Sequence, residues 1–152
     1  MIVGVEVKEL VGHSDDRQTF REVIRASDAF FGEGFGQLSY ALMNPGTAKA
    51  WHVHQRQVDW WYVPMGALKL ALYDTRADSP TSGELDEFLL GPEHGHKVVR
   101  IPPGVAHGCR VLGGMTQLFY VTSNEYDPAD EGRIPHDDPT IGYDWMAEPE
   151  IK

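Results

Sequence analysis

The sequence predicts an all-β domain, folded as a sandwich or barrel of short strands. Runs of about five to eight residues rich in Val, Leu, Tyr and Trp recur along the chain, a pattern typical of such folds. Sixteen glycines and ten prolines supply turn signals between these runs. The 152 residues, 41 % of them hydrophobic, fit one domain with a sizeable core, so we expect a single domain over residues 1–152.

The expected strands follow one another with short connections. In chain order they are MIVGVEV (1–7), QLSYALM (37–43), the stretch around His52 and His54, VDWWYVPM (58–65), ALKLALYD (67–74), LDEFLLG (85–91), HKVVRIP (96–102), GCRVLGG (108–114) and TQLFYVTS (116–123). The two runs on either side of Gly66 are typical of the arms of a hairpin. Trp60, Trp61 and Tyr62 cannot share one face of a strand, so one face is expected to be core and the other to line a cavity or an interface.

Two segments depart from the strand pattern. The segment DDRQTFREVIRAS, residues 15–27, is the one helix candidate, because it starts with acidic residues and has modest helical periodicity. The tail, residues 127–152, is rich in Asp, Glu and Pro, and we expect it to lie over the domain as an extended segment. These boundaries leave the barrel itself at approximately residues 30–126.

The composition excludes several classes of partner and compartment. Thirteen Lys and Arg against 23 Asp and Glu give a net charge of −10, which argues against binding to nucleic acid or to an anionic membrane. Cys109 is the one cysteine, so no intrachain disulfide can form. The first residues lack a signal-peptide pattern, and no run is long enough for a transmembrane helix, so a cytoplasmic protein is expected.

The sequence HVHQRQVD, residues 52–59, predicts a functional site. His52 and His54 share one face of a strand, because alternate residues point the same way. Asp59 follows on the same run, and His107 comes after a Pro-Pro-Gly turn. Three imidazoles and one carboxylate suit zinc, iron, manganese, nickel or copper, and would leave coordination positions open for chemistry. The alternative is that these histidines are ordinary strand residues.

The spacing of these residues resembles the two cupin motifs. Gly46, His52, His54, Asp59 and Gly66 match the first motif, in which the family usually has Glu at the Asp59 position. The second motif is matched by Gly95, Pro102, Gly104 and His107. The resemblance implies a cupin barrel, a double-stranded β-helix or jelly roll, whose interior holds a site.

The chain is also similar to one cupin group, the dTDP-4-dehydrorhamnose 3,5-epimerases. The matching pieces are DDRQTFRE, KAWH, YDTRADSPTSGE, IPPGVAHG, FYVTSNEYDP and DDPTIGYDW. The resemblance implies that His52 removes a proton beside the C4 ketone of a dTDP-linked 6-deoxy-4-keto hexose, and that Tyr120 supplies a proton from the opposite face. It also implies a homodimer. The positions that would contact substrate or nucleotide are Arg17, Glu22, Gln37, Lys49, His107 and Glu131, with Lys49 in the place of an arginine.

Departures from that group bear on the mechanism. Asp59 replaces a lysine that stabilises the enolate, and His54 replaces a glutamine. The aspartate that supports the base in the family has no counterpart in the sequence. The substitutions at 54 and 59 complete a metal ligand set of His52, His54, Asp59 and His107, but a metal-bound His52 could not also be the free base. In that case Tyr120 would be the leading acid–base group.

Three functions remain open from the sequence. The first is an epimerase or isomerase acting on a keto sugar nucleotide or a related carbohydrate. The second is a metal-dependent cupin enzyme, either a dioxygenase or an isomerase of a small carbonyl compound. The third is a cupin that binds a small ligand without turnover. The fold alone does not choose among them, because cupins host many functions.

Overall fold

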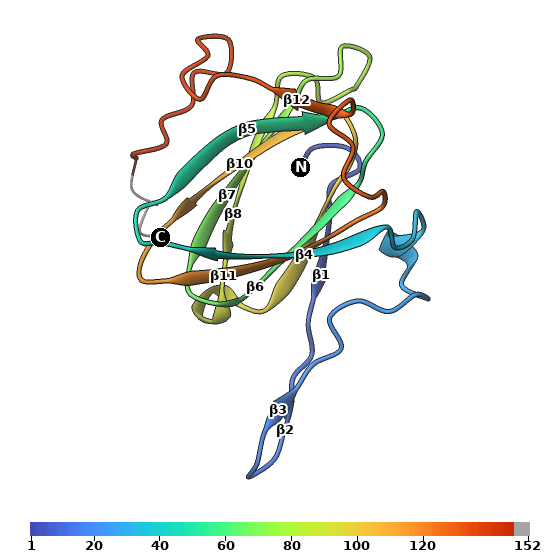
Figure 1. The fold of residues 1–152 in the computed structure, drawn as a ribbon, viewed down its shortest axis with the longest axis vertical. Coiled ribbons are helices and arrows are strands. Elements are labelled where there is room, and N and C mark those ends of the chain that lie inside the picture. Colours follow the sequence, from blue (N-terminus) through green and yellow to red (C-terminus); the bar gives the residue numbers. More distant parts are fainter. Residues whose placement is uncertain (148–152) are drawn as a thin grey trace.

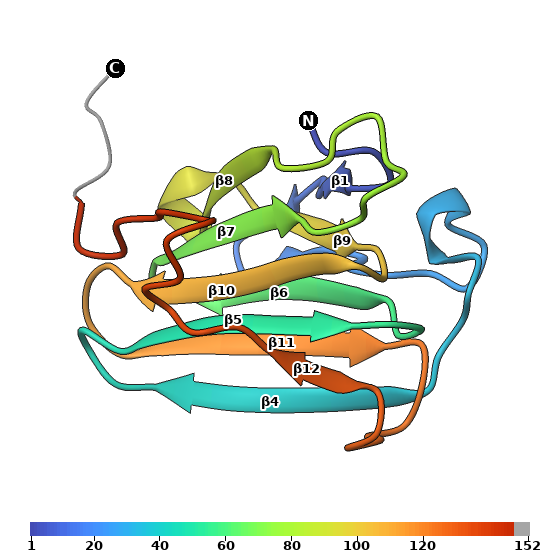
Figure 2. The same ribbon diagram turned by 90° about the horizontal axis from the view of Figure 1, so that it is seen from above.

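Two five-stranded antiparallel sheets face each other in the computed structural model, which describes residues 1–147 (Figures 1 and 2). The first sheet has the order β1 (Glu6–Glu9), β9 (Lys97–Ile101), β6 (Asp59–Met65), β11 (Thr116–Thr122), β4 (Gln37–Met43). The second has the order β12 (Glu131–Arg133), β5 (Ala48–His54), β10 (Val105–Val111), β7 (Leu68–Asp74), β8 (Leu85–Leu90). A separate two-stranded ribbon pairs β2 (His13–Ser14) with β3 (Thr19–Phe20).

The chain passes repeatedly from one sheet to the other. From β4 to β7, successive strands alternate between the two sheets, and so do the strands from β8 to β12. This winding is the jelly-roll or double-stranded β-helix of a cupin barrel, so the predicted fold class is confirmed. Two short 3-10 turns, η1 (Ala29–Phe31) and η2 (Pro92–His94), complete the regular elements of the described chain. Within residues 1–147, no helix has the length and apolar character needed to cross a membrane.

The turn at Gly66 corrects the hairpin prediction. β6 and β7 flank this residue as expected, but β6 pairs with β9 and β11, whereas β7 pairs with β8 and β10. Gly66 therefore carries the chain across the barrel. Its φ of 92° favours glycine, and a Cβ there would lie 2.3 Å from the hydroxyl oxygen of Thr116. This close approach explains why glycine occupies the last position of the first cupin motif.

The predicted helix over residues 15–27 is wrong. The carboxylate of Asp15 accepts hydrogen bonds from the backbone N–H groups of Arg17 (2.8 Å) and Gln18 (3.1 Å), and this closes a tight turn between β2 and β3. Local side chain-to-backbone bonds of this kind compete with helix formation. The ribbon projects away from the barrel (Figure 1).

Apolar side chains are buried on both faces of each sheet. Trp61 points into the core between the sheets, whereas Trp60 packs outside the first sheet with Phe30 and Phe31. The strand alternation expected for the Trp-Trp-Tyr run is therefore confirmed. Because this strand is covered on both faces, its register is strongly fixed.

The tail covers the outer face of the second sheet. Ile141 and Trp145 pack there against Trp51 of β5, and Figure 2 shows this segment, in red, crossing the sheet. The part of the predicted tail after Ala147 lies outside the described residues. β1 and β12 also join the sheets, although both lie outside the predicted barrel limits of 30–126.

A buried carboxylate organises the loop that follows β7. Asp74 is 1 % exposed and accepts hydrogen bonds from the guanidinium of Arg76 (2.8 Å) and the hydroxyls of Ser79 (2.6 Å) and Thr81 (2.7 Å). Arg76 also donates to the carbonyl oxygen of Val3 at 2.7 Å, which ties the N-terminus to the loop. The Arg76 guanidinium holds the pKa of Asp74 far below its usual range.

Replacing Asp74 with Asn should lower the free energy of unfolding by about 2–3 kcal/mol, because a buried ion pair loses its anion. The depressed pKa means that this stabilisation is present above pH ~4 and is lost as the pH falls further. Urea unfolding of both proteins at pH 7 and at pH 3 would measure this, with a smaller gap expected at pH 3. Asp78→Asn, at an exposed position of the same loop, is the matched control. Equal stability of D74N and D78N at pH 7 would contradict the prediction.

Candidate active site

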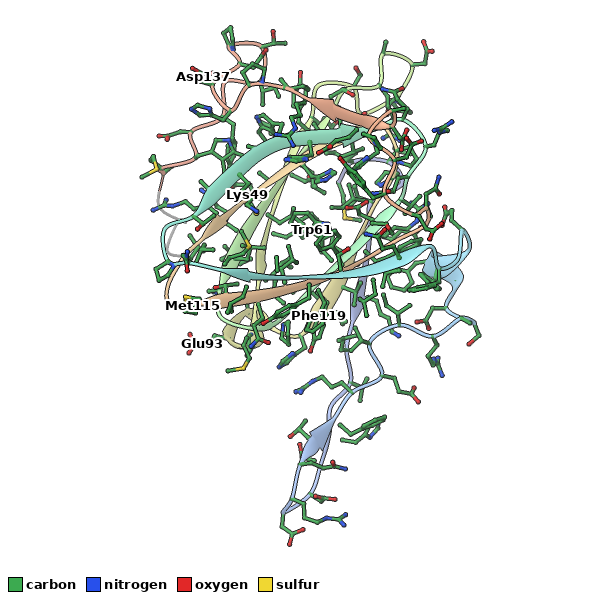
Figure 3. The ribbon with its side chains drawn as sticks, in the orientation of Figure 1. Lys49, Trp61, Glu93, Met115, Phe119 and Asp137 are labelled. Atoms are coloured by element: carbon green, nitrogen blue, oxygen red, sulfur yellow. The ribbon has the colours of Figure 1, made fainter. Side chains whose placement is uncertain are left out.

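A cavity of about 210 Å³ lies between the two sheets. Figure 3 shows Lys49 and Trp61 pointing into the interior, with Phe119 on the outer side of its sheet. The polar residues of the lining are Gln37, Lys49, His52, His54, Gln57, Asp59, His107, Tyr120, Thr122, Tyr126 and Glu131. The structure thus brings together all but two of the predicted site residues.

The two predicted residues outside the cavity are Arg17 and Glu22. Arg17 lies at the tip of the projecting ribbon, where it pairs with Asp15 at 2.7 Å. Glu22 lies just beyond the ribbon, 3.6 Å from Arg25. Neither lines the cavity of its own chain.

The histidines come from two neighbouring strands of the second sheet. His52 on β5 lies directly opposite His107 on β10 in the strand register, and their ring centres are 6.3 Å apart. His54 shares the inward face of β5 with His52, and its ring centre lies 5.7 Å from that of His107. The structure thus places the three imidazoles on one interior wall.

His52 has a carboxylate partner that sequence reasoning assigned to another role. Its Nδ1 lies 3.0 Å from Oε1 of Glu131, which sits on β12 next to β5. Burial lowers the pKa of His52, and the charge of Glu131 opposes that shift. The ring is therefore neutral near pH 7, with Nδ1–H donating to Glu131 and Nε2 left as the available basic nitrogen. No sequence pattern indicates this contact, because β12 falls in the segment that is expected to be an extended tail.

A second carboxylate, Asp130, fixes the loop between His54 and Asp59. It accepts hydrogen bonds from the backbone N–H groups of residues 55, 56 and 57, at 3.1, 3.0 and 3.1 Å. This loop connects His54 on β5 to Asp59 on β6, and so joins the two sheets. Asp130 thus sets how the second sheet's histidines face the first sheet's aspartate.

Asp59 is buried and held by two neutral donors. Its Oδ1 accepts from the Gln57 side-chain amide at 2.8 Å, and its Oδ2 accepts from the Trp61 indole N–H at 3.1 Å. The same Oδ2 lies 3.9 Å from Nε2 of His107. The predicted metal set is thus divided: ligand atoms of His54, Asp59 and His107 lie within 4.8 Å of one another, and His52 is not part of that group.

Tyr120 faces the histidine wall from the first sheet. It lies on β11, opposite Trp61 of β6 in the register, and lines the same cavity as His52 on β5. Gln37, on β4 of the first sheet, also lines the cavity, and Lys49 enters from β5. The arrangement places a basic imidazole and a phenol on opposite walls of one cavity.

The comparisons with known proteins agree on one family. A family model described as dTDP-4-dehydrorhamnose 3,5-epimerase matches residues 1–152. The spore coat polysaccharide biosynthesis protein SpsL of Bacillus subtilis is 46 % identical over 151 residues, which cover 97 % of this chain and 99 % of SpsL. The probable low-salt glycan biosynthesis epimerase Agl13 of Haloferax volcanii is 43 % identical, covering 97 % of this chain and 96 % of Agl13.

A solved structure extends the similarity to a ligand complex. The dTDP-6-deoxy-D-glucose-3,5-epimerase of Legionella pneumophila, in complex with dTDP-4-keto-L-rhamnose, superposes with a TM-score of 0.87 at 25 % sequence identity. The match covers 99 % of this chain and 83 % of that one.

The Glu131 contact predicts the tautomer of His52. At pH 7.5 we expect His52 to carry its proton on Nδ1, and in Glu131→Ala we expect the Nε2–H form to become populated, because the carboxylate that fixes the ring is gone. Two-bond ¹⁵N–¹H correlation spectra of the imidazoles would report both states, with the His52 signals identified by their loss in His52→Asn. Glu125→Ala, at an exposed position, is the control. An Nε2–H tautomer in the wild type would contradict the geometry.

Proposed function

The chain belongs to the dTDP-4-dehydrorhamnose 3,5-epimerase family, and on that premise we propose that it inverts a carbon beside the ketone of a 4-keto-6-deoxy sugar carried on a nucleoside diphosphate. The observation that carries the proposal is the placement of His52 and Tyr120 on opposite walls of one cavity. Epimerisation needs a base on one face of the substrate carbon and an acid on the other. The matched family and the epimerase relatives support this function over the dioxygenase and the non-catalytic alternatives.

In the proposed reaction His52 acts as the general base. Its Nε2 takes the proton from the carbon next to the ketone, and the electron pair of the broken C–H bond forms an enolate. Glu131 stabilises the imidazolium that results, because the carboxylate lies 3.0 Å from Nδ1. We therefore propose Glu131 as the positioning residue for His52, rather than as the nucleotide contact that the resemblance implied.

Tyr120 completes the reaction as the acid. Its phenol gives a proton to the opposite face of the same carbon, which inverts the centre; the phenolate then regains a proton from solvent, and the imidazolium of His52 releases its proton to solvent. Lys49 and Gln37 line the same cavity and are proposed to contact the nucleotide-bearing part of the substrate. A single lysine offers a phosphate a point charge and not the paired contacts of an arginine.

The test is solvent deuterium exchange with the dTDP-linked 4-keto-6-deoxy hexose. His52→Asn should lose both exchange and epimerisation by about 10²–10⁴-fold, since no base remains. Tyr120→Phe should still exchange the proton but form at least about tenfold less inverted product. Mass spectrometry and NMR of the sugar in D₂O measure both quantities.

The matched controls are His94→Asn and Tyr40→Phe. They remove an imidazole and a phenol hydroxyl, respectively, at positions outside the cavity. Wild-type exchange in H52N would refute the base assignment. Full inversion by Y120F would refute the assignment of Tyr120 as the acid. No exchange in the wild type with any keto sugar nucleotide would refute the function itself.

We also propose a cytoplasmic homodimer. The outer face of the first sheet carries an apolar groove of about 370 Å³, lined by Val23, Ile24, Leu38, Trp60, Tyr62, Pro64, Phe119 and Val121. The neighbouring ribbon projects from its own chain and exposes Phe20 by 53 %. A second copy seated on this face would cover the groove and bring Arg17 toward the partner's cavity, which would give this cation the substrate contact it lacks in its own chain.

Mixing two inactive variants tests the shared site. Arg17→Ala and His52→Asn chains, co-expressed in equal amounts, should regain about a quarter of wild-type activity, because half of the dimers are mixed and one of their two sites is intact. Mixing H52N with Y120F should restore none, because both residues belong to one cavity. Light scattering should give twice the chain mass of 17.0 kDa. A monomer, or full activity of R17A alone, would contradict the proposal.

A further inference from the structure

We propose that His54, Asp59 and His107 bind one divalent transition-metal ion inside the cavity, beside His52 but without it. One ligand atom from each of the three residues lies within 4.8 Å of the other two. Two imidazoles and one carboxylate are a donor set for zinc, iron(II) or manganese, and they leave further coordination positions open. All three side chains project into the cavity described above, so an ion there would be accessible to a ligand.

One of the two histidines, His107, is oriented for this role by its other ring nitrogen. Nδ1 of His107 lies 3.3 Å from the carbonyl oxygen of Val105, which can only accept, so that nitrogen carries the proton and Nε2 is free. Nδ1 of His54 lies 3.8 Å from Oδ2 of the buried Asp130, too far for a hydrogen bond, and its Nε2 lies 3.4 Å from the side-chain nitrogen of Gln57. Histidines that bind metals usually have a partner on the second nitrogen, as His107 does.

The aspartate is oriented in the same way. The hydrogen bonds from Gln57 and Trp61 hold its two oxygens in place, while Oδ2 remains 3.9 Å from Nε2 of His107. These donors are neutral, and within residues 1–147 no lysine or arginine forms an ion pair with Asp59. A carboxylate that is 4 % exposed carries a charge that water does not screen, and a bound cation would balance it.

With only three ligands, His52 does not have to be both a metal ligand and the general base, which was the conflict raised by the sequence. His52 is paired with Glu131 through Nδ1, and its Nε2 stays free for the proton, while the ion is held by the neighbouring residues on the same wall. The catalytic use of the ion rests on the proposed function, but its binding does not. When bound, a divalent cation would supply positive charge inside the cavity, and positive charge near a ketone favours loss of the neighbouring proton.

Metal titration of the full chain, without a histidine tag, tests the site. After chelator treatment, the wild type is titrated with Zn²⁺ and with Mn²⁺ by calorimetry, and elemental analysis gives the metal content of the protein as purified. We expect one ion per chain. His54→Gln and Asp59→Asn should each weaken binding by at least about 100-fold, because each removes a ligand. His52→Asn is the matched variant: it removes an imidazole from the same wall and should keep the wild-type affinity.

Circular dichroism melting of every variant shows whether it is folded, and the exchange assay runs alongside. An ion retained in H52N and lost in H54Q and D59N supports the proposal. Absence of binding to folded wild-type protein at millimolar Zn²⁺ and Mn²⁺ would overturn it, as would equal loss in H52N, which would make His52 a ligand. Loss of exchange in H52N with the ion retained would separate the base from the metal site, so failure of one assignment is distinguishable from failure of the other.

Discussion

The antiparallel pairing of β5 with β10 is the interaction on which the cavity depends. It sets His52 against His107, and strand alternation then places His54 on the same interior wall while Trp51 and Ala106 turn outward. The outward side chains are buried under the tail, so a slip by one residue would drive imidazoles into an apolar layer. The two-sided burial of the sheet therefore fixes the geometry of the polar groups inside it.

Strand periodicity and motif spacing account for much of this site. His52 and His54 lie on one face as alternation requires, and the second motif delivers His107 to the neighbouring strand. Lys49 shows the limit of that rule, because an odd spacing from His52 should place it on the other face. It reaches the cavity because the register of β5 and β10 shifts between His107 and Cys109, and no pattern in the sequence marks that irregularity.

What the sequence could not supply is contact between distant segments. The family resemblance implies a nucleotide contact for Glu131, and nothing in the tail predicts a strand as short as β12, which has three residues. The segment after Asp15 has an acidic start suited to a helix, yet its first carboxylate closes a turn instead. At Gly66 the glycine was correctly placed at a turn, but only the tertiary packing of Thr116 shows that the turn links two sheets. For Glu131 and Gly66 the deciding partner lies in a distant part of the chain, whereas at Asp15 a local contact closes the turn.

Asp130 and Glu131 are consecutive residues with separate tasks: one holds the backbone of residues 55–57, and the other orients His52. Both carboxylates arrive together when β12 adds to the edge of β5, so detachment of this three-residue strand would remove both at once. In the proposed reaction, the fraction of active molecules would then be the fraction with this edge closed, and the local stability of the tail would govern it rather than global unfolding. Substitutions outside the cavity, at Ile141 or Trp145 of the tail, would then act on turnover through the population of the closed edge.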